Sequence, residues 1–213
     1  YDQHTVKGFE AGAKASLLGG DLRTRLSLYT YDVKGLQVTI STGTGFQELK
    51  NVGKVRSKGG EFDFSYRTPL EGLSLRGAVA YNDASYLDYF ANCYRGQTKA
   101  LGCAFVAVPG GQPGQAMPAA PGQNGSLQDL AGGQVVRAPE WTGNVGFDYE
   151  MPVGAGMKLG LSTNMTFSAS YFSDPSSTPY ARVPNYQLFD ATLRLVEQDD
   201  RWEIALIGRN LSD

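Results

Sequence analysis

Hydrophobic and polar residues alternate most clearly between Met157 and Tyr171. From Met157 onward every second residue is apolar or aromatic except Thr163, and the residues between them are polar or small. Because successive side chains of a strand point to opposite faces, this pattern predicts a strand with one apolar and one polar face. The strand spans about fifteen residues, whereas strands of soluble proteins usually have five or six.

The ten residues from Trp141 to Glu150 show a similar alternation, so the two segments predict a long hairpin. Its polar face consists mainly of Ser, Thr, Asn and Gly, with few charged residues. Such small side chains are typical of a crowded, water-filled or plugged lumen, whereas a soluble sandwich carries many Lys and Glu on its wet face. The hairpin therefore predicts the wall of a membrane β-barrel.

Six more strands follow from the same alternation elsewhere in the chain. The eight predicted strands cover residues 8–18, 22–38, 48–67, 73–82, 141–150, 157–171, 189–195 and 202 onward. Short connections (19–21, 68–72, 152–156, 197–201) alternate strictly with longer ones (39–47, 87–135, 173–184). Outer-membrane barrels have this order, with short periplasmic turns and long extracellular loops. The predicted fold class is all-β, an antiparallel up-and-down transmembrane β-barrel segment. A soluble up-and-down barrel would explain the alternation but not the strand lengths or the loop asymmetry.

Residues 87–135 predict an irregular, long extracellular loop. They show no sustained period, and residues 109–125 contain four Pro and five Gly. Neither residue type suits a helix interior or a central strand. In contrast, the strand ends are rich in aromatic residues that would form girdles at the membrane interfaces. These are Tyr66, Tyr81, Tyr86, Tyr149, Tyr171 and Trp202.

Composition excludes several other functions. The net charge of −2 offers no basic surface for nucleic acid. The single histidine, His4, excludes a His-based catalytic dyad and a multi-histidine metal site within this chain. We therefore expect neither an enzyme nor a bound metal or cofactor, and no apolar run is long enough for a transmembrane helix. Composition alone leaves Cys93 and Cys103 open to a disulfide or to free thiols.

Several cations fall on the polar phase of the predicted strands and would project into a lumen. There they would meet a plug or an anionic ligand, or they would simply be solvated, which is the simpler interpretation. They are Lys14, Arg23, Arg25, Arg76, Lys158 and Arg194.

Five sequence segments, spread over the whole chain in the right order, resemble the barrel strands of TonB-dependent receptors. They are Val6–Gly12, Leu28–Gln37, Asn51–Glu61, Arg137–Trp141 and Trp202–Asp213. The resemblance implies that residues 1–213 are a C-terminal portion of a bacterial outer-membrane barrel, about 8 of 22 strands. We would then expect the plug domain, the TonB box and the last strand to lie outside this sequence.

The resemblance also implies a function. Receptors of this family take up scarce, bulky nutrients, and a ferric siderophore is the expected ligand, with transport energised by TonB. The expected partners are outer-membrane lipid, the TonB complex through the plug, and a small molecule such as a metal chelate. The alternative is a small outer-membrane barrel that acts as a structural anchor or adhesin, because eight strands can close alone.

We place ligand contact at the start of the long loop. Tyr89, Phe90 and Tyr94 stand close to a cation, Arg95. Flat rings beside a positive charge suit a bulky, partly aromatic, anionic chelate, although the same rings would also serve as loop packing or as the outer girdle. In a loop that faces an oxidising space we expect Cys93 and Cys103 to be bonded, a restraint of roughly 2–3 kcal/mol. Residues 109–125 would remain mobile.

Overall fold

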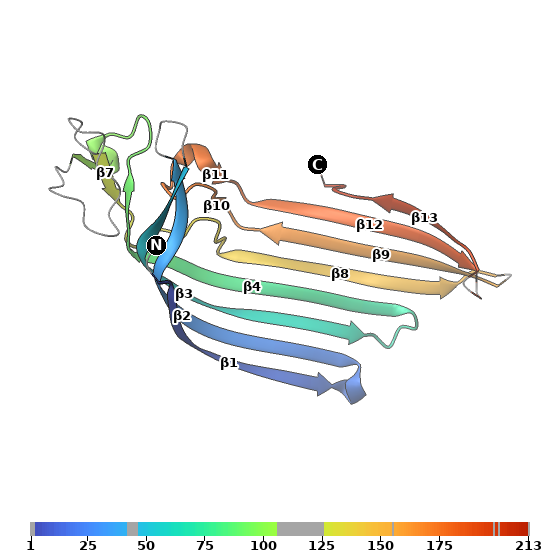
Figure 1. Ribbon diagram of the computed structural model, residues 1–213. Coiled ribbons are helices and arrows are strands. Elements are labelled where there is room, and N and C mark those ends of the chain that lie inside the picture. Colours follow the sequence, from blue (N-terminus) through green and yellow to red (C-terminus); the bar gives the residue numbers. More distant parts are fainter. Residues whose placement is uncertain are drawn as a thin grey trace.

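The computed structural model describes residues 3–41, 47–105, 126–154, 156–197, 199 and 201–212. Eight strands form one antiparallel sheet in which each strand pairs with the next (Figure 1). In spatial order they are β1 (Thr5–Leu17), β2 (Leu22–Ser41), β3 (Gln47–Arg67), β4 (Leu73–Asp88), β8 (Trp141–Pro152), β9 (Met157–Ser168), β12 (Tyr186–Glu197) and β13 (Glu203–Gly208). No helix in the described part is long and apolar enough to cross a membrane.

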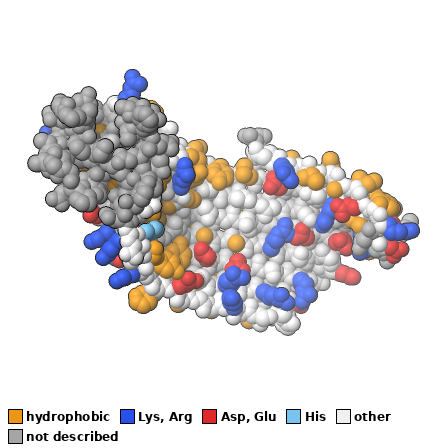
Figure 2. Space-filling view, in the orientation of Figure 1, with side chains coloured by type: hydrophobic (Ala, Val, Ile, Leu, Met, Phe, Trp, Pro, Cys, Tyr) orange, Lys and Arg blue, Asp and Glu red, His pale blue; other side chains and the backbone are white. Residues whose placement is uncertain are grey.

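The register confirms the two faces predicted from the alternation. Residues that pair directly share a face, so Lys14, Arg25 and Asp63 lie side by side across β1, β2 and β3. Following the register across all eight strands places the six predicted inward-pointing cations together on this polar face. Figure 2 shows charged side chains scattered over this face among uncharged atoms. The opposite, apolar face carries exposed Phe9, Leu26 and Phe62.

The predicted hairpin turn after β1 is also confirmed. Leu18–Gly20 forms a single 3-10 turn, and Gly19 and Gly20 have φ of 68° and 101°. Glycine adopts these positive values without steric cost. The chain therefore reverses within a few residues at this end of the sheet, as it also does between β3 and β4.

Residues 87–135 are not wholly irregular, and the prediction was wrong in this respect. β4 continues to Asp88, and three short strands form a second sheet in the order β5-β7-β6. They are β5 (Phe90–Asn92), β6 (Cys103–Phe105) and β7 (Ser126–Asp129). Strands this short have no readable period, and β7 pairs with partners far away in sequence, which explains the error. The Pro- and Gly-rich segment, residues 109–125, lies entirely outside the described residues.

The loop after β9 contains a second small hairpin. β10 (Tyr171–Phe172) pairs with β11 (Arg182–Val183), and the 3-10 turn Pro179–Ala181 precedes β11. The long strand predicted to reach Tyr171 therefore ends at Ser168.

The buried core lies where the small β5-β7-β6 sheet meets those ends of β2 to β4 that are closest to the long loop. Val33, Val55 and Tyr86 form one cross-strand row on the polar phase, and Tyr89 and Val135 pack against it. The loop therefore folds back over the polar face at this end of the sheet. Further members of this mouth core are Leu36, Ala84, Ala91, Leu130 and Ala138.

Tyr86 was predicted in an aromatic girdle, and that prediction was wrong. Its side chain is fully buried and lies on the polar phase, inside the mouth core. Tyr81, by contrast, is on the apolar phase, where its ring centroid lies 4.8 Å from that of Trp141. Position along a strand therefore does not decide which face a ring occupies, whereas the register does.

Gly143 on β8 lies beneath the ring of Phe167 on β9. A Cβ at this position would stand 2.7 Å from the ring and 2.6 Å from the carbonyl oxygen of Ala78. We expect Gly143→Ala in the full-length receptor to lower stability by about 1–3 kcal/mol, because the ring or the backbone must shift. Unfolding in urea, followed by tryptophan fluorescence, measures the change.

Gly160→Ala is the matched control on the neighbouring strand. Its new Cβ would find its nearest neighbour, the Arg194 side chain, at 3.6 Å, an ordinary contact. Equal destabilisation by the two substitutions would show that the ring over Gly143 is unimportant.

Candidate functional site

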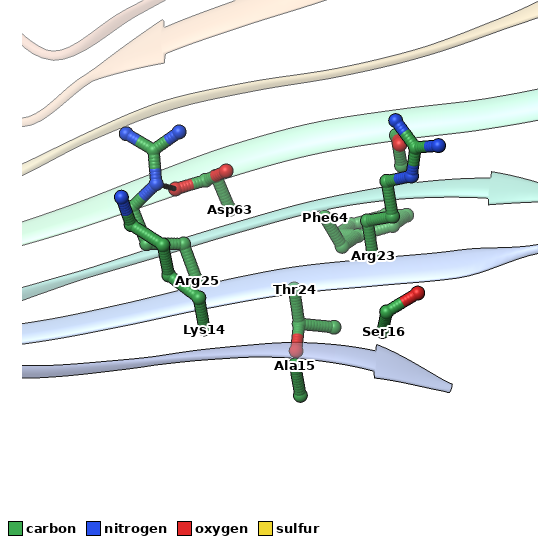
Figure 3. A pocket seen from close by; sticks show the side chains of 9 residues that line it. Lys14, Ala15, Ser16, Arg23, Thr24, Arg25, Asp63 and Phe64 are labelled. Atoms are coloured by element: carbon green, nitrogen blue, oxygen red, sulfur yellow. Dashed lines mark ion pairs between the residues drawn. The ribbon is translucent and has the colours of Figure 1, made fainter. Parts of the chain in front are cut away.

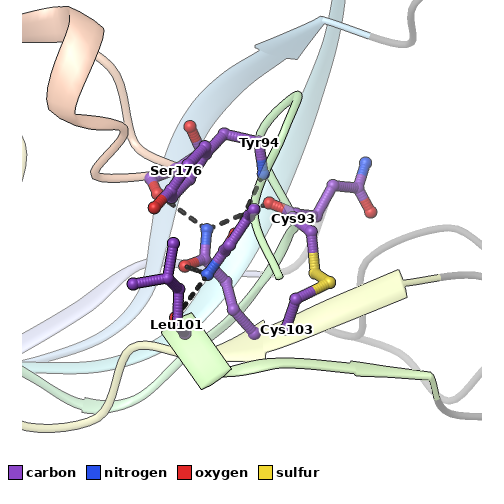
Figure 4. Close-up of a disulfide and its surroundings, with 8 residues drawn as sticks. Cys93, Tyr94, Leu101, Cys103 and Ser176 are labelled. Carbon is purple, nitrogen blue, oxygen red and sulfur yellow. Dashed lines mark hydrogen bonds between the residues drawn. A yellow bond between two sulfur atoms is a disulfide. The ribbon is translucent and has the colours of Figure 1, made fainter. Parts of the chain in front are cut away.

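The predicted disulfide is present and closes a ring of the long loop. The Cys93 and Cys103 sulfurs are bonded, and their Cα atoms lie 5.7 Å apart. Gln97 fills this ring: its Oε1 accepts from the backbone N–H of Tyr94 at 3.1 Å, and its Nε2 donates to the carbonyl of Leu101 at 3.0 Å (Figure 4). The disulfide is therefore confirmed, and one amide holds the ring in shape.

Gln128 on β7 is the hub of the loop region. Its side chain is 5% exposed. Its Nε2 donates to the carbonyls of Asn92 at 3.1 Å and Ser176 at 2.7 Å, and its Oε1 accepts from Nε2 of Gln97 at 3.0 Å. A buried amide is stable only with its hydrogen bonds made. Gln128 therefore ties together β5, the disulfide ring and the loop that follows β9.

Two more hydrogen bonds join these two long loops. Nε2 of Gln134 reaches the carbonyl of Ser170 at 3.4 Å, and the backbone N–H of Arg137 donates to the carbonyl of Phe172 at 2.8 Å. Asp174 accepts from the backbone N–H of Ser176 at 2.8 Å, a local turn next to the carbonyl that Gln128 binds. The segments on either side of β8 and β9 thus form one folded unit at this end of the sheet.

Tyr89, expected to contact ligand, lies inside the mouth core. It is 5% exposed, and its ring centroid is 4.6 Å from that of Tyr86. Burial raises the pKa of the Tyr89 phenol, which therefore stays neutral. Tyr86 is fixed in turn, because its hydroxyl oxygen accepts from the backbone N–H of Val136 at 3.2 Å. The ring of Tyr89 therefore serves as loop packing, the alternative to ligand contact.

The other three expected ligand residues are accessible. Phe90 is 40% exposed, Arg95 is exposed and Tyr94 is half-buried. Tyr94 and Arg95 stand within the disulfide ring, whereas Phe90 is on β5. All three belong to the same loop, although no hydrogen bond or ring contact links Phe90 to Arg95 among the described residues.

The polar face offers a shallow hollow between β1, β2 and β3 (Figure 3). It has a volume of about 460 Å³, and Lys14, Arg23, Arg25 and Asp63 contribute its charged groups. Nε of Arg25 lies 3.5 Å from the Asp63 carboxylate, and both side chains are well exposed. Exposed pairs of this kind contribute little energy. Their simplest interpretation remains a solvated face.

Ion pairs on the remainder of the polar face cross between neighbouring strands. Arg76 pairs with Asp148, and Nζ of Lys158 lies 3.7 Å from the Glu150 carboxylate. Within the described ranges no cluster of His, Cys, Asp and Glu is suitable for a metal ion. The sequence analysis missed the amides of Gln97 and Gln128, since non-periodic segments give no signal for contacts between distant residues.

An antiparallel sheet with one apolar face, tight turns at one end and long folded loops at the other defines the wall of an outer-membrane type of β-barrel. Residues 4–211 match the family described as "TonB dependent receptor-like, beta-barrel", so the chain belongs to the TonB-dependent receptors. Barrels of this family are proteins of the Gram-negative outer membrane, which is therefore the location of this chain.

Three solved structures share the fold. The ferric yersiniabactin uptake receptor FyuA from Yersinia pestis gives a TM-score of 0.64 at 14% identity. The siderophore receptor PiuA from Acinetobacter baumannii gives 0.62 at 18%, and the ferric-catecholate import receptor Fiu from E. coli gives 0.59 at 16%. The comparisons cover 99%, 98% and 100% of this chain, but only 25%, 24% and 24% of the respective receptors.

A curated relative is similar in sequence over a shorter stretch. The metal-pseudopaline receptor CntO of Pseudomonas aeruginosa is 34% identical over 84 residues. This alignment covers 39% of the chain and 11% of the relative. The chain therefore corresponds to a part of each of these receptors.

Replacing Gln128 tests whether its side chain holds the two long loops together. We expect Gln128→Ala in the full-length receptor to cost about 1–3 kcal/mol, because the carbonyls of Asn92 and Ser176 lose their shared donor. Amide hydrogen exchange should accelerate in both long loops, although the substitution lies in only one.

Gln187→Ala serves as the control, since the Gln187 side chain on β12 is exposed. Faster exchange confined to residues around 128, with the loop after β9 unchanged, would contradict a shared hub.

Proposed function

We propose that this chain forms wall and outer loops of an active-transport receptor that takes up a metal chelate, with a ferric siderophore as the leading candidate, energised by TonB. The observation that carries the proposal is the family match over residues 4–211. The named relatives are receptors for siderophores or metal chelates, and this supports a metal chelate as the ligand class. Family membership also supports transport rather than catalysis.

In this proposal the apolar face meets outer-membrane lipid and the polar face lines the lumen. Alternate residues meet lipid in a membrane barrel, and the apolar phase keeps many large side chains exposed. The polar phase carries cross-strand ion pairs, such as that of Arg76 with Asp148, and the hydroxyl-rich rows. The long loops then lie outside the cell, and the tight turns lie in the periplasm.

We assign ligand contact to Phe90, Tyr94 and Arg95, whereas Tyr89 is packed inside the mouth core. The mouth core fixes their loop against the lumen side of β2 to β4. Rings and a guanidinium on a fixed support suit a bulky anionic chelate. The TonB complex would act through a plug domain, whereas residues 4–211 of this chain match the barrel.

The alternative was a small eight-stranded barrel that serves as anchor or adhesin. Closure would pair β1 with β13, but these strands lie at opposite ends of the sheet order in the described residues. In the structures that share the fold, the matching region is about a quarter of a longer chain. Both observations favour the receptor.

Two neighbouring residues of β9 can test whether the apolar face of the sheet meets lipid. Leu161→Arg should destabilise the full-length receptor by about 2–4 kcal/mol, because it places a charge in lipid near the midplane. Ser162→Arg should cost less, since Ser162 lies on the polar face. Refolding into lipid vesicles across a urea series measures both, and a larger cost for Ser162→Arg would show that the facing is inverted.

Uptake tests the function itself. Cells that carry the full-length gene should accumulate labelled ferric siderophore, and cells without the gene or without TonB should not. Replacing Phe90 by Ala and Arg95 by Gln together should weaken binding by roughly 10-fold or more, the loss expected for one charged contact and one ring.

Lys99→Gln is the matched control for this double variant, because it removes an exposed cation from the same loop. Unchanged binding by the double variant would remove this loop surface from the ligand site. Unchanged uptake without the gene would reject the transport function for that ligand.

A further inference from the structure

The apolar face turns basic close to its extracellular end. Four adjacent strands place Ala11, Leu28, Gly60 and Tyr81 in one cross-strand row. The next rows toward the loops carry many charged residues, although the first of them still contains Phe9 and Thr30. Within these rows lie the five residues of what we call the outer basic cluster, Lys7, Lys34, Lys54, Arg56 and Lys58.

Two of these cations have carboxylate partners on the same face. Nε and Nη2 of Arg56 donate to the two carboxylate oxygens of Asp32 at 2.7 and 2.9 Å. Nζ of Lys58 lies 3.1 Å from the Asp83 carboxylate. The carboxylates of Asp32 and Asp83 are therefore already engaged.

The other three cations, Lys7, Lys34 and Lys54, are exposed, and none forms an ion pair with a described residue. Lys34 and Lys54 are direct cross-strand partners. Like charges in this position repel and destabilise a sheet unless something compensates them. Asp88 is opposite Lys54 across a bulge, yet no ion pair joins the two. Asp32 also attracts Lys34 and Lys54 at longer range. The five cations still outnumber the three carboxylates of these rows, Asp32, Asp83 and Asp88, so the site keeps a net positive charge that suits a multiply charged anion.

The surroundings of the cluster indicate what kind of anion would bind. A hollow of about 550 Å³ lies among these rows, and Lys7, Lys34, Arg56 and Phe9 are among the residues that line it. Phe9 is 83% exposed, and Leu28, one row below, is 55% exposed. Cations thus lie directly above an exposed apolar surface. This order matches a molecule with an anionic headgroup and acyl chains.

We propose that the outer basic cluster binds the phosphorylated headgroup of a glycolipid in the outer leaflet. Phosphate groups would contact Lys7, Lys34 and Lys54, and acyl chains would lie along Phe9 and Leu28. Basic groups at the edge of an apolar band hold lipid phosphates in this manner. The inference rests on the proposed function in one respect, namely that the apolar face meets lipid. The site is on the outside of the wall, on the other face from the lumen.

The test uses full-length receptor in detergent and measures, by native mass spectrometry, how much diphosphoryl lipid A it retains. The variant Lys34→Gln/Lys54→Gln should reduce this retention by about thirtyfold, since each lysine at an anionic membrane surface contributes about fivefold. Lys34→Arg/Lys54→Arg keeps both charges and should retain the lipid. If the Gln variant does not fold, the single variant Lys7→Gln should still show a loss of about fivefold.

The control Lys14→Gln/Arg23→Gln removes two cations from the polar face and should leave retention unchanged. Equal losses in both double variants would overturn the proposal, because only net charge would then matter. Equal retention of dephosphorylated and diphosphoryl lipid A would overturn it too. Displacement of the lipid by millimolar inorganic phosphate would assign the cluster to a free anion instead.

The outcome is separable from that of the proposed function. Leu161→Arg and Ser162→Arg report which face meets lipid, and siderophore uptake reports transport. Correct facing and normal uptake together with undiminished lipid retention in Lys34→Gln/Lys54→Gln would overturn only the lipid site.

Discussion

The structure depends on the requirement that every backbone amide inside a bilayer finds a partner within the protein. The six inner strands meet it by pairing on both sides, in an unbroken ladder of neighbours from β1 to β13. A ladder of this kind makes the two faces independent, because side chains alternate regardless of which strand is next. One face can then be apolar and the other hydroxylic and charged. The division into an apolar and a polar face follows from pairing rather than from any buried core.

Among the described residues, the packed apolar core lies where the ladder ends. At the mouth, the small β5-β7-β6 sheet covers the upper rows of β2 to β4 and buries Tyr86 and Tyr89. Water is available there, so unpaired loop backbone is tolerated, and packing rather than the ladder decides the conformation. The same chain thus uses two sources of stability, hydrogen-bonded strands in the wall and a conventional apolar cluster in the loops.

Alternation in the sequence was enough to predict the eight strands, their antiparallel order and the identity of each face, because a period of two survives in long strands. It could not predict the β5-β7-β6 sheet or the hub at Gln128, whose contacts join segments with no period. Phe90 and Tyr89 are adjacent in sequence, but only tertiary packing separates an exposed ring from a buried one. The alternation of β2 weakens from Tyr29 to Asp32, where aromatic and polar residues occupy the two phases. The physical cause is that β2 leaves its apolar band there and enters the charged rows.

Gln128 has a consequence for how the mouth moves. With a single buried amide bonded to Asn92, Gln97 and Ser176, the disulfide ring and the loop after β9 cannot open separately without leaving a polar group unpaired. The two loops therefore form one cooperative opening unit of the kind that hydrogen exchange detects. A molecule that binds to either loop should therefore slow the local opening of both. The two loops at the mouth then open and close together, and the side chain of Gln128 couples them.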